Sequence, residues 1–304
     1  MSVNNISVFV SSADSYSDIW PAFFTLFKKE WPEFSGIIYL NTEYLSYEYE
    51  GLNIVCTKLG KQKRFGEFFL RGLEYVEGDI FLLFMIDYFL ESRVNVVDLQ
   101  TFYSFFKQED IDSFTLMTQP YGYRQVKGDS RCAYMDCSLG WEIMFSFQVA
   151  FWKKASLKKL IYKWEDPWRA EYFGSRRAAA YYMKFCILTS RENMPFKYDE
   201  AGVLHGGGRW LHSAISRINL DGVPLDIALS NRSYYSETKY PLLNVLWVEL
   251  KCTPQKIHSW FVIIFNHPNA VKFLFLDYVR RLKKIFGLIR CLVIKESTLH
   301  EKEG

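Results

Sequence analysis

The sequence lacks the features that mark a membrane-spanning or disulfide-bonded protein. Its longest apolar runs, such as Trp260 to Phe265, are far shorter than the roughly 20 residues that a transmembrane helix needs. The six cysteines include no CxxC pair, and no signal peptide precedes the first strand-like run at Ile6. We therefore expect a cytoplasmic protein whose cysteines stay reduced and mostly act as small buried apolar side chains.

Glycine is also missing where one common nucleotide-binding motif needs it. No glycine lies between Ser11 and Trp20, so the loop after the first predicted strand does not provide the GxGxxG turn of a dinucleotide-binding dehydrogenase. A later glycine run, in VLHGGGRW, is followed by Arg209 and Trp210 rather than by Lys and Ser or Thr. It is therefore not a P-loop.

The composition that is present favours one sizeable folded domain. Of 304 residues, 49% are apolar and 18% are aromatic, which is enough to fill a core and still line a cleft. The length suits one large α/β domain with a smaller appendage. We place a soft boundary near residue 225, which gives a domain over 1–225 and an aromatic, basic, helical region over 226–304.

Hydrophobic periodicity predicts alternating strands and helices in the first half of the chain. We predict strands over 6–11, 36–40, 52–56, 112–117 and 141–150, and helices over 19–31, 64–76, 97–107, 155–162 and 167–184. The segment DIFLLFMIDYFL, Asp79 to Leu90, holds an unbroken apolar run that terminates on Asp87 and is typical of a strand buried on both faces of a mostly parallel sheet. The pattern indicates a Rossmann-like nucleotide domain, with more helical character after Lys153.

Asp87 closes that apolar run. A carboxylate at this position is costly to bury unless it is paired or holds a metal, and the carboxyl ends of central strands are where ligands bind in open α/β sheets. The alternative is that Asp87 simply caps the next loop or helix.

A second cluster, Trp164-Glu-Asp-Pro-Trp-Arg-Ala-Glu171, mixes carboxylates with tryptophans. Aromatic rings pack on the apolar faces of sugars while carboxylates bind sugar hydroxyls, so the mixture suits a glycan cleft. Asp166 and Pro167 have the positions of an N-cap and a first helical residue. Glu171 then lies near a helix start, whose dipole would keep it ionised and able to act as a base. Alternatively, the acids cap the helix and the tryptophans belong to the core.

The glycine-rich segment offers further ligands. Its glycines permit close approach of a phosphate, and Arg209 can pair with that phosphate. His205 is either a metal ligand or an ordinary loop histidine.

Four segments together carry a family resemblance: ISVFVSSADSYSDIWPAFFTLFKKEWP, DIFLLFMIDYFL, SFQVAFWKKASLKKLI with EDPWRAEYFGSRRA, and VLHGGGRW. In this order, over roughly residues 5–215, they resemble a bacterial group of GT-A-like glycosyltransferases found in polysaccharide and lipopolysaccharide loci. The resemblance implies an α/β, GT-A-like fold with a mostly parallel central sheet flanked by helices. It also implies a nucleotide-sugar donor and a glycan or lipid-linked glycan acceptor.

The resemblance further implies residue roles. Ser11 and Asp14 lie in the segment expected to meet the base and ribose, and Asp87 matches an acid of a DxD-like element that holds the diphosphate through Mn²⁺ or Mg²⁺. Trp168 and Glu171 match a Trp-x-x-Glu element on the acceptor side, with Glu171 as the catalytic base. The remaining expected site residues are Asp166 for catalysis, Arg64 and Arg209 for the donor, Trp164 and Arg176 for the acceptor, and His205 as a second metal ligand.

One position departs from that family pattern. Ile86 stands where an acid is expected, so metal binding would rest on a single carboxylate. Arg64, Arg209 or His205 could then supply part of the charge neutralisation, or the protein could be a catalytically silent carbohydrate- or nucleotide-binding protein on the same fold.

The C-terminal region has its own pattern. Over 271–295, apolar residues recur every three or four positions and cations fill the others, which predicts a basic amphipathic helix. Such a helix either packs on the main domain or lies on an anionic membrane surface, here the inner face of the plasma membrane. Nucleic-acid binding is a weaker alternative, because the cations are confined to one end and Glu165, Asp166 and Glu171 would repel phosphates.

Overall fold

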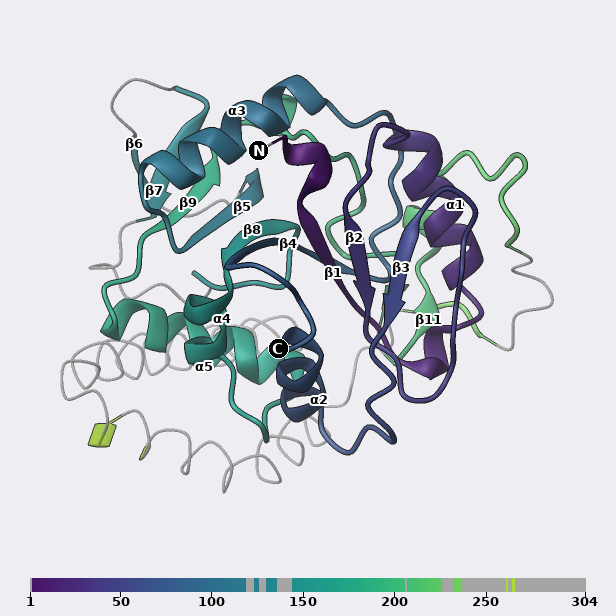
Figure 1. Ribbon diagram of the computed structural model, residues 1–304, viewed down its shortest axis with the longest axis horizontal. Coiled ribbons are helices and arrows are strands. Elements are labelled where there is room, and N and C mark those ends of the chain that lie inside the picture. Colours follow the sequence, from purple (N-terminus) through teal and green to yellow (C-terminus); the bar gives the residue numbers. More distant parts are fainter. Residues whose placement is uncertain are drawn as a thin grey trace, which may run out of the picture.

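The computed structural model describes residues 2–118, 123–125, 130–135, 144–205, 207–225, 232–236, 261 and 264–265. Within them the chain forms one large sheet between two layers of helices (Figure 1). The predicted α/β architecture, a mostly parallel central sheet flanked by helices, is confirmed. The expected helical region over 226–304, with the amphipathic helix over 271–295, lies outside the described residues apart from 232–236, 261 and 264–265.

The large sheet has the strand order β3-β2-β1-β4-β8-β5-β9-β7-β6. The first four strands in this order are parallel, β8 runs antiparallel between β4 and β5, β9 is parallel to β5, and β7 and β6 add antiparallel pairs at the edge. The strands are β1 (Ser7–Ser11), β2 (Ile37–Leu40), β3 (Asn53–Cys56), β4 (Ile80–Met85), β5 (Ser113–Thr118), β6 (Tyr123–Gln125), β7 (Cys132–Met135), β8 (Ala150–Lys153) and β9 (Phe185–Leu188). A separate hairpin pairs β10 (Leu204–His205) with β11 (Arg209–Trp210).

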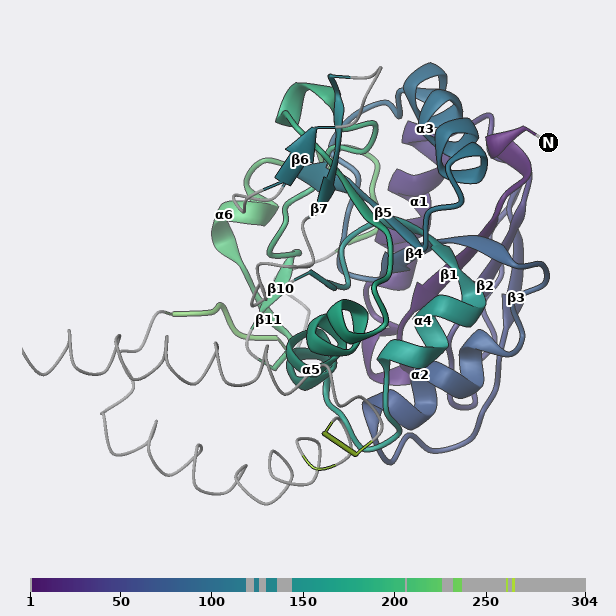
Figure 2. The same ribbon diagram turned by 90° about the vertical axis from the view of Figure 1, so that its left-hand side faces the viewer.

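Helices cover both faces of this sheet. They are α1 (Trp20–Glu30), α2 (Phe65–Leu73), α3 (Val96–Gln108), α4 (Lys154–Leu160), α5 (Pro167–Ala180) and α6 (His212–Ile215), with short 3₁₀ turns η1 (Val3–Asn5), η2 (Asp14–Tyr16) and η4 (Arg191–Asn193). The buried side chains of α1 and α3 share one core cluster, and those of α2, α4 and α5 share another. Figure 2 shows α2, α4 and α5 together below the sheet.

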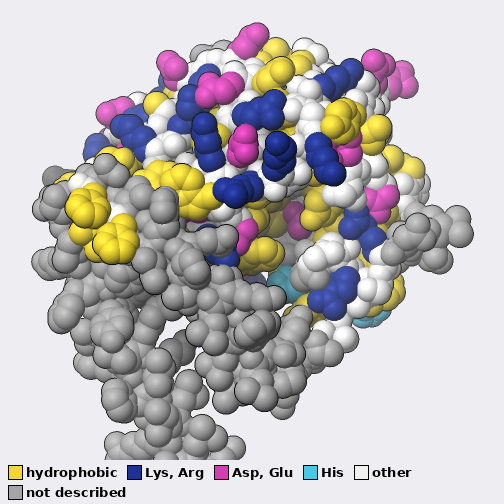
Figure 3. Space-filling view, turned by 90° about the horizontal axis from the view of Figure 1, so that it is seen from below, with side chains coloured by type: hydrophobic (Ala, Val, Ile, Leu, Met, Phe, Trp, Pro, Cys, Tyr) yellow, Lys and Arg dark blue, Asp and Glu magenta, His cyan; other side chains and the backbone are white. Residues whose placement is uncertain are grey.

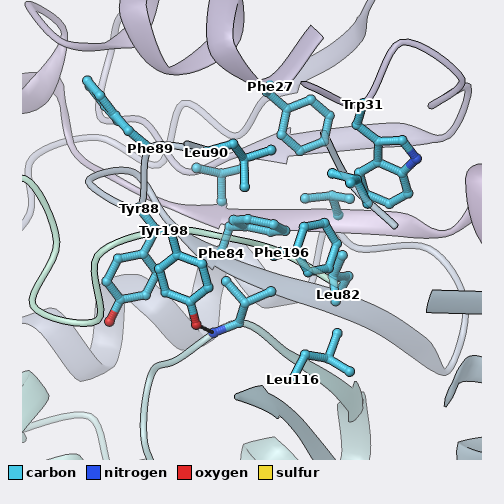
Figure 4. Close-up of a cluster of buried hydrophobic side chains, with 14 of the residues drawn as sticks. Phe27, Trp31, Leu82, Phe84, Tyr88, Phe89, Leu90, Leu116, Phe196 and Tyr198 are labelled. Atoms are coloured by element: carbon cyan, nitrogen blue, oxygen red, sulfur yellow. Dashed lines mark hydrogen bonds between the residues drawn. The ribbon is translucent and has the colours of Figure 1, made fainter. Parts of the chain in front are cut away.

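The central strands explain why two cores form. Successive side chains of a strand point to opposite faces, so a strand between two helical layers must be apolar at every position. In β4, Leu82 and Phe84 enter the cluster with α1 and α3, whereas Phe81 and Leu83 enter the cluster with α2, α4 and α5. Figure 4 shows part of the first cluster, where the Phe84 and Phe196 rings meet edge to face at 5.2 Å.

Most predicted elements are confirmed within two or three residues, and three predictions are wrong. The predicted strand over 141–150 is instead irregular over 144–149 and pairs only as β8, while 141–143 lie outside the described residues. The apolar run after Asp79 leaves the sheet at Met85, because Tyr88 already closes a turn onto the Met85 carbonyl. The sheet also continues beyond Lys153, since α5 ends at Ala180 and β9 returns beside β5.

Candidate active site

The strand order places a ligand crevice between β1 and β4. The chain moves outward from β1 to β2 and β3 on one side, and returns to β4 on the other, so the loops after β1 and β4 diverge. In open α/β sheets, ligands bind at the carboxyl ends of the strands at such a reversal of strand order. Tyr16, after β1, and Asp87 and Tyr88, after β4, line a cavity of about 310 Å³ there.

The cavity brings together residues from six parts of the chain. Besides the loops after β1 and β4, its walls come from the 147–148 segment, the start of α5, the 200–201 turn and the β10–β11 hairpin. Three carboxylic acids line it, namely Asp87, Glu171 and Glu200. Trp168 lies at its rim with 69% of its surface exposed, so one of the largest apolar side chains is presented to solvent beside these acids. An exposed indole next to carboxylates is the combination that binds sugars.

Asp87 is held at one end of the cavity by its own backbone and by a glycine. The Val203 amide donates to the Asp87 carbonyl at 2.9 Å. A Cβ on Gly202 would lie 2.4 Å from the Asp87 Oδ2 atom, and Gly202 has φ +74°, so a glycine is required beside this carboxylate. Burial raises the pKa of Asp87 to about 7, against a smaller opposite effect of its own backbone amide.

Helix α5 presents Glu171 to the same cavity. Asp166 is the N-cap, accepting a hydrogen bond from the Arg169 amide at 2.9 Å, and Pro167 is the first helical residue, as the sequence predicts. Glu171 lies one turn further on, where its Oε1 atom accepts a hydrogen bond from the Phe147 amide at 2.8 Å.

The protonation state of Glu171 differs from the prediction. We expected the helix dipole to keep Glu171 ionised, but burial raises its pKa to about 7 despite the hydrogen bond from Phe147. The dipole acts mainly within the first turn, which Asp166 already caps, so desolvation decides the outcome. Glu171 therefore titrates near neutral pH.

A buried ion pair that the sequence analysis did not assign fixes the start of α5. Arg177 donates to both carboxylate oxygens of Glu165, at 2.9 and 2.6 Å, and both side chains are fully buried. The Arg177 guanidinium also donates to the Leu160 carbonyl and stacks over the Tyr162 ring. This pair ties the 160–165 loop to the middle of α5, and so sets the direction in which Trp168 and Glu171 leave the helix.

Tyr88 lines the cavity, and Tyr198 packs against it from behind the lining. The rings of Tyr88 and Tyr198 lie 4.9 Å apart (Figure 4). The Tyr198 hydroxyl accepts a hydrogen bond from the Val149 amide and donates one to the Gln148 side chain. Burial, and next the negative charge of Asp87, raise the pKa of Tyr88 well above its usual value. Tyr88 thus stays a neutral hydroxyl between the acids, a role that no sequence motif signals.

Arg232 connects two loops that border the cavity. Its guanidinium forms a bidentate ion pair with the Asp18 carboxylate at 2.7 Å. It also donates hydrogen bonds to the carbonyls of Ser15 and Gly208. It also lies over the Tyr16 ring at 5.2 Å. We call this set of contacts the Arg232 clamp. It joins the loop after β1 to the glycine-rich turn of the β10–β11 hairpin, and both segments contribute to the cavity lining.

The residues predicted to hold a metal are only partly suited to it. Asp87 and His205 both line the cavity, and His205 also packs edge to face on Tyr235. Among the described residues, however, no three His, Cys, Asp or Glu side chains converge as a metal site. Ile86 is buried in the core with 3% of its surface exposed, so an acid at that position would not reach the cavity. The described donor set therefore does not complete a divalent-metal site.

The other predicted site residues lie outside the described cavity lining. The Asp14 carboxylate accepts hydrogen bonds from the amides of residues 43–45, and so holds the loop after β2. Ser11 ends β1 and is buried, and Arg64 is exposed at the start of α2. The three remaining predicted site residues each lie against an aromatic ring. Trp164 packs on Tyr162, Arg176 is buried over Tyr172, and Arg209 lies over Tyr235.

Comparisons with known proteins add little beyond the fold. No protein family model matches the chain, and no curated protein matches it significantly. Solved structures with a similar fold include TarS of S. aureus (14% identity, TM-score 0.39), which covers 61% of this chain and 35% of its own. The galactosyltransferase LgtC in complex with donor and acceptor sugar analogues has 10% identity and a TM-score of 0.40, covering 72% of this chain and 95% of its own. Apo UDP-glucose pyrophosphorylase has 10% identity and a TM-score of 0.41, covering 64% and 92%.

This chain thus spans about a third of the length of TarS. At such low identities and scores these structures show nothing of the activity of this chain. In the described part of the chain, no helix has the length and hydropathy to cross a bilayer.

Proposed function

We propose that this protein is a glycosyltransferase that moves a sugar from a nucleotide-diphosphate sugar to a glycan or lipid-linked glycan, in cell-surface polysaccharide or lipopolysaccharide synthesis. One observation carries the proposal: Asp87 after β4 and Glu171 on α5 line the same cavity, with the exposed Trp168 at its rim. The cavity lies at the carboxyl ends of β1 and β4, where a nucleotide is expected in this topology. We place the reaction at the cytoplasmic face of the membrane.

In this proposal Glu171 is the catalytic base. The Phe147 amide holds its Oε1 atom, so Oε2 is the oxygen that can receive a proton from the acceptor hydroxyl. As that hydroxyl oxygen bonds to the anomeric carbon, the bond from this carbon to the diphosphate breaks and the proton passes to Glu171. A pKa of about 7 suits this role, because a base works best when its pKa is near the working pH.

Trp168 and Asp87 serve the two substrates from different sides. The exposed indole of Trp168 packs against the acceptor sugar, and its neighbours on α5 orient that sugar toward Glu171. Asp87 faces the donor, in the crevice between β1 and β4. The described cavity lining includes no lysine or arginine, so the charge of the diphosphate must be balanced by a bound cation or by residues beyond the described ones.

The test is release of nucleoside diphosphate from uridine, guanosine and thymidine diphosphate sugars, with and without manganese. We expect release from one of these donors, increased by an acceptor glycan. Trp168→Ala should raise the KM for the acceptor about ten-fold or more and leave the KM for the donor nearly unchanged, because one lost stacking contact costs about 1–2 kcal/mol. No release from any donor under either condition would contradict the proposal.

A second candidate function is a catalytically silent carbohydrate- or nucleotide-binding protein with the same cavity. The incomplete metal-ligand set around Asp87 and His205 favours it. A thermal-shift screen separates the two, because binding raises the melting temperature whether or not turnover follows. A nucleotide that raises the melting temperature without any sugar transfer or hydrolysis would support the silent protein.

A further inference from the structure

Two segments of the chain are basic and free of acids. Between Thr57 and Phe65 the charged residues are Lys58, Lys61, Lys63 and Arg64, and all four are exposed. Between Trp152 and Glu165 every charged residue is a lysine, and Lys159 and Lys163 are among the exposed ones. Neither segment belongs to the cavity described above.

The fold brings these two segments side by side. The amides of Gly66 and Glu67, at the start of α2, donate to the carbonyls of Glu165 and Lys163 at 2.9 and 3.0 Å. A Cβ on Gly66 would lie 2.0 Å from the Tyr162 carbonyl oxygen, so this close approach requires glycine. These two adjoining segments carry the six exposed cations Lys58, Lys61, Lys63, Arg64, Lys159 and Lys163, which we call the basic strip. Lys and Arg side chains gather on this face, beside a hollow (Figure 3).

An apolar tip adjoins the basic strip. Tyr44 and Leu45 are 66% and 44% exposed in the loop after β2, which the Asp14 carboxylate holds. The Lys61 amide donates to the Tyr44 hydroxyl at 2.9 Å, and the Gln62 amide donates to the Glu43 carboxylate at 2.6 Å. The tip therefore lies against the strip, and the Glu43 carboxylate at this contact accepts the Gln62 amide.

We propose that the basic strip and the Tyr44–Leu45 tip dock this protein on an anionic membrane surface. The negative surface potential of an anionic leaflet makes the binding free energy of nearby lysines more favourable. An exposed tip of one aromatic and one aliphatic side chain can enter the interfacial region of the bilayer. This surface belongs to the folded domain, and is separate from the C-terminal segment 271–295.

The composition of the strip favours a membrane over a soluble polyanion. Five of its six cations are lysines, which act as mobile point charges, whereas recognition of individual phosphates typically uses the fork of arginine. Inorganic polyphosphate, in addition, offers no apolar surface to an exposed tyrosine and leucine beside the cations.

The basic strip lies on the same edge of the sheet as the cavity. The strip follows β3 and contacts the loop that leads into Pro167 and Trp168, so it lies at the carboxyl edge of the sheet, where the cavity opens. Docking would hold the cavity mouth close to the bilayer. If the proposed glycosyl transfer holds, on which this step rests, the acceptor is lipid-borne.

The test is co-sedimentation of the full chain with phosphatidylcholine vesicles, with and without phosphatidylglycerol. The strip variant carries Lys61→Glu, Lys63→Glu and Lys163→Glu. The matched control carries Lys29→Glu, Lys107→Glu and Lys184→Glu, which change the net charge equally. These three exposed lysines lie at the ends of α1 and α3 and just before β9, hence at the opposite edge of the sheet.

We expect the strip variant to lose about ten-fold or more of its partitioning onto anionic vesicles, and the control to change less than about two-fold. Leu45→Ser should weaken partitioning further at high salt, where the charges are screened. Equal losses in strip variant and control, or no loss in either, would overturn the proposal. So would a strip variant that keeps vesicle binding but loses binding to inorganic polyphosphate, which would indicate a soluble polyanion.

Donor hydrolysis without acceptor keeps the two proposals apart. The strip variant should hydrolyse a soluble nucleotide sugar at the wild-type rate, because no strip residue lines the cavity. Vesicle binding by a protein that uses no nucleotide sugar would leave the docking proposal standing and contradict only the proposed function.

Discussion

At the scale of single residues, the two cavity acids decide what the site can do. Asp87 and Glu171 each have a pKa raised to about 7 by burial, so near neutral pH they exchange protons easily. Carboxylic acids with a pKa raised in this way are typical of functional sites. Burying them lowers the stability of the fold, and other interactions must offset that cost.

Asp87→Asn should stabilise the protein at high pH only. The folded-state pKa of about 7 lies above the roughly 3.9 of an unfolded aspartate, so the folded protein holds this proton more tightly. Asp87 therefore favours folding most below about pH 4, and this contribution is lost as the pH rises to about 7.

Because the carboxylate opens partly onto the cavity, we expect Asp87→Asn to add only about 1 kcal/mol at pH 8, or roughly 2–4 °C in melting temperature, and almost nothing at pH 4. Melting curves across this pH range check it, with Glu48→Gln, an exposed acid, as control. An equal gain in melting temperature at pH 4 and pH 8 would contradict the raised pKa of Asp87.

The pH dependence of turnover tests Glu171. A base must be ionised, so kcat/KM should fall about ten-fold for each pH unit below the pKa of about 7. Glu171→Gln keeps an oxygen to accept the Phe147 amide, and its residual activity should lose this acid limb. An unchanged limb in Glu171→Gln would mean that another group sets the profile.

At the scale of elements, α5 depends on the Glu165–Arg177 pair. Removing one partner leaves a buried charge without its counter-ion, so Arg177→Met should cost about 3–5 kcal/mol of unfolding free energy. Glu165→Gln combined with Arg177→Met should recover part of this loss, since neither charge then remains. Urea denaturation measures the free energy of unfolding of the single and double variants. If the loss in the double variant equals the sum of the two single losses, the two residues are not coupled.

The Arg232 clamp should control the two loops that border the cavity. Arg232→Ala removes the ion pair with Asp18 and the contacts to Ser15 and Gly208. We expect hydrogen exchange of amides 13–18 and 207–210 to accelerate about ten-fold or more, while the β4 amides are unchanged. Arg191→Ala, at an exposed ion pair, is the control. Unchanged exchange in both loops would show that the clamp does not hold them.

At the scale of the whole molecule, local sequence patterns predicted those features that depend on residues close together in the sequence. The continuous apolar run of β4 identified a central strand and pointed to Asp87 at its end, and the Asp166-Pro167 pair identified the start of α5 and, with it, the place of Glu171. Both acids were therefore found from the sequence, because each follows directly from the element beside it.

Contacts between distant segments could not be predicted in this way. Arg232 meets Asp18 across 214 residues, and Glu200 reaches the cavity through a turn that carries no motif. The ionised state that the helix dipole predicted for Glu171 is wrong for a similar reason, because burial in the folded protein, which the sequence of α5 does not report, raises its pKa. Periodicity reports which face of an element is buried, but not which segment buries it.

The central claim is that one cavity serves the donor through Asp87 and the acceptor through Glu171. The most direct measurement is a side-by-side titration and turnover assay of Asp87→Asn and Glu171→Gln, with the nucleoside diphosphate of the active donor as the titrant. We predict that Asp87→Asn weakens nucleotide binding about ten-fold or more, whereas Glu171→Gln binds the nucleotide as the wild type does and loses turnover about 100-fold or more. The reverse pattern, weak nucleotide binding in Glu171→Gln and normal binding in Asp87→Asn, would contradict the account.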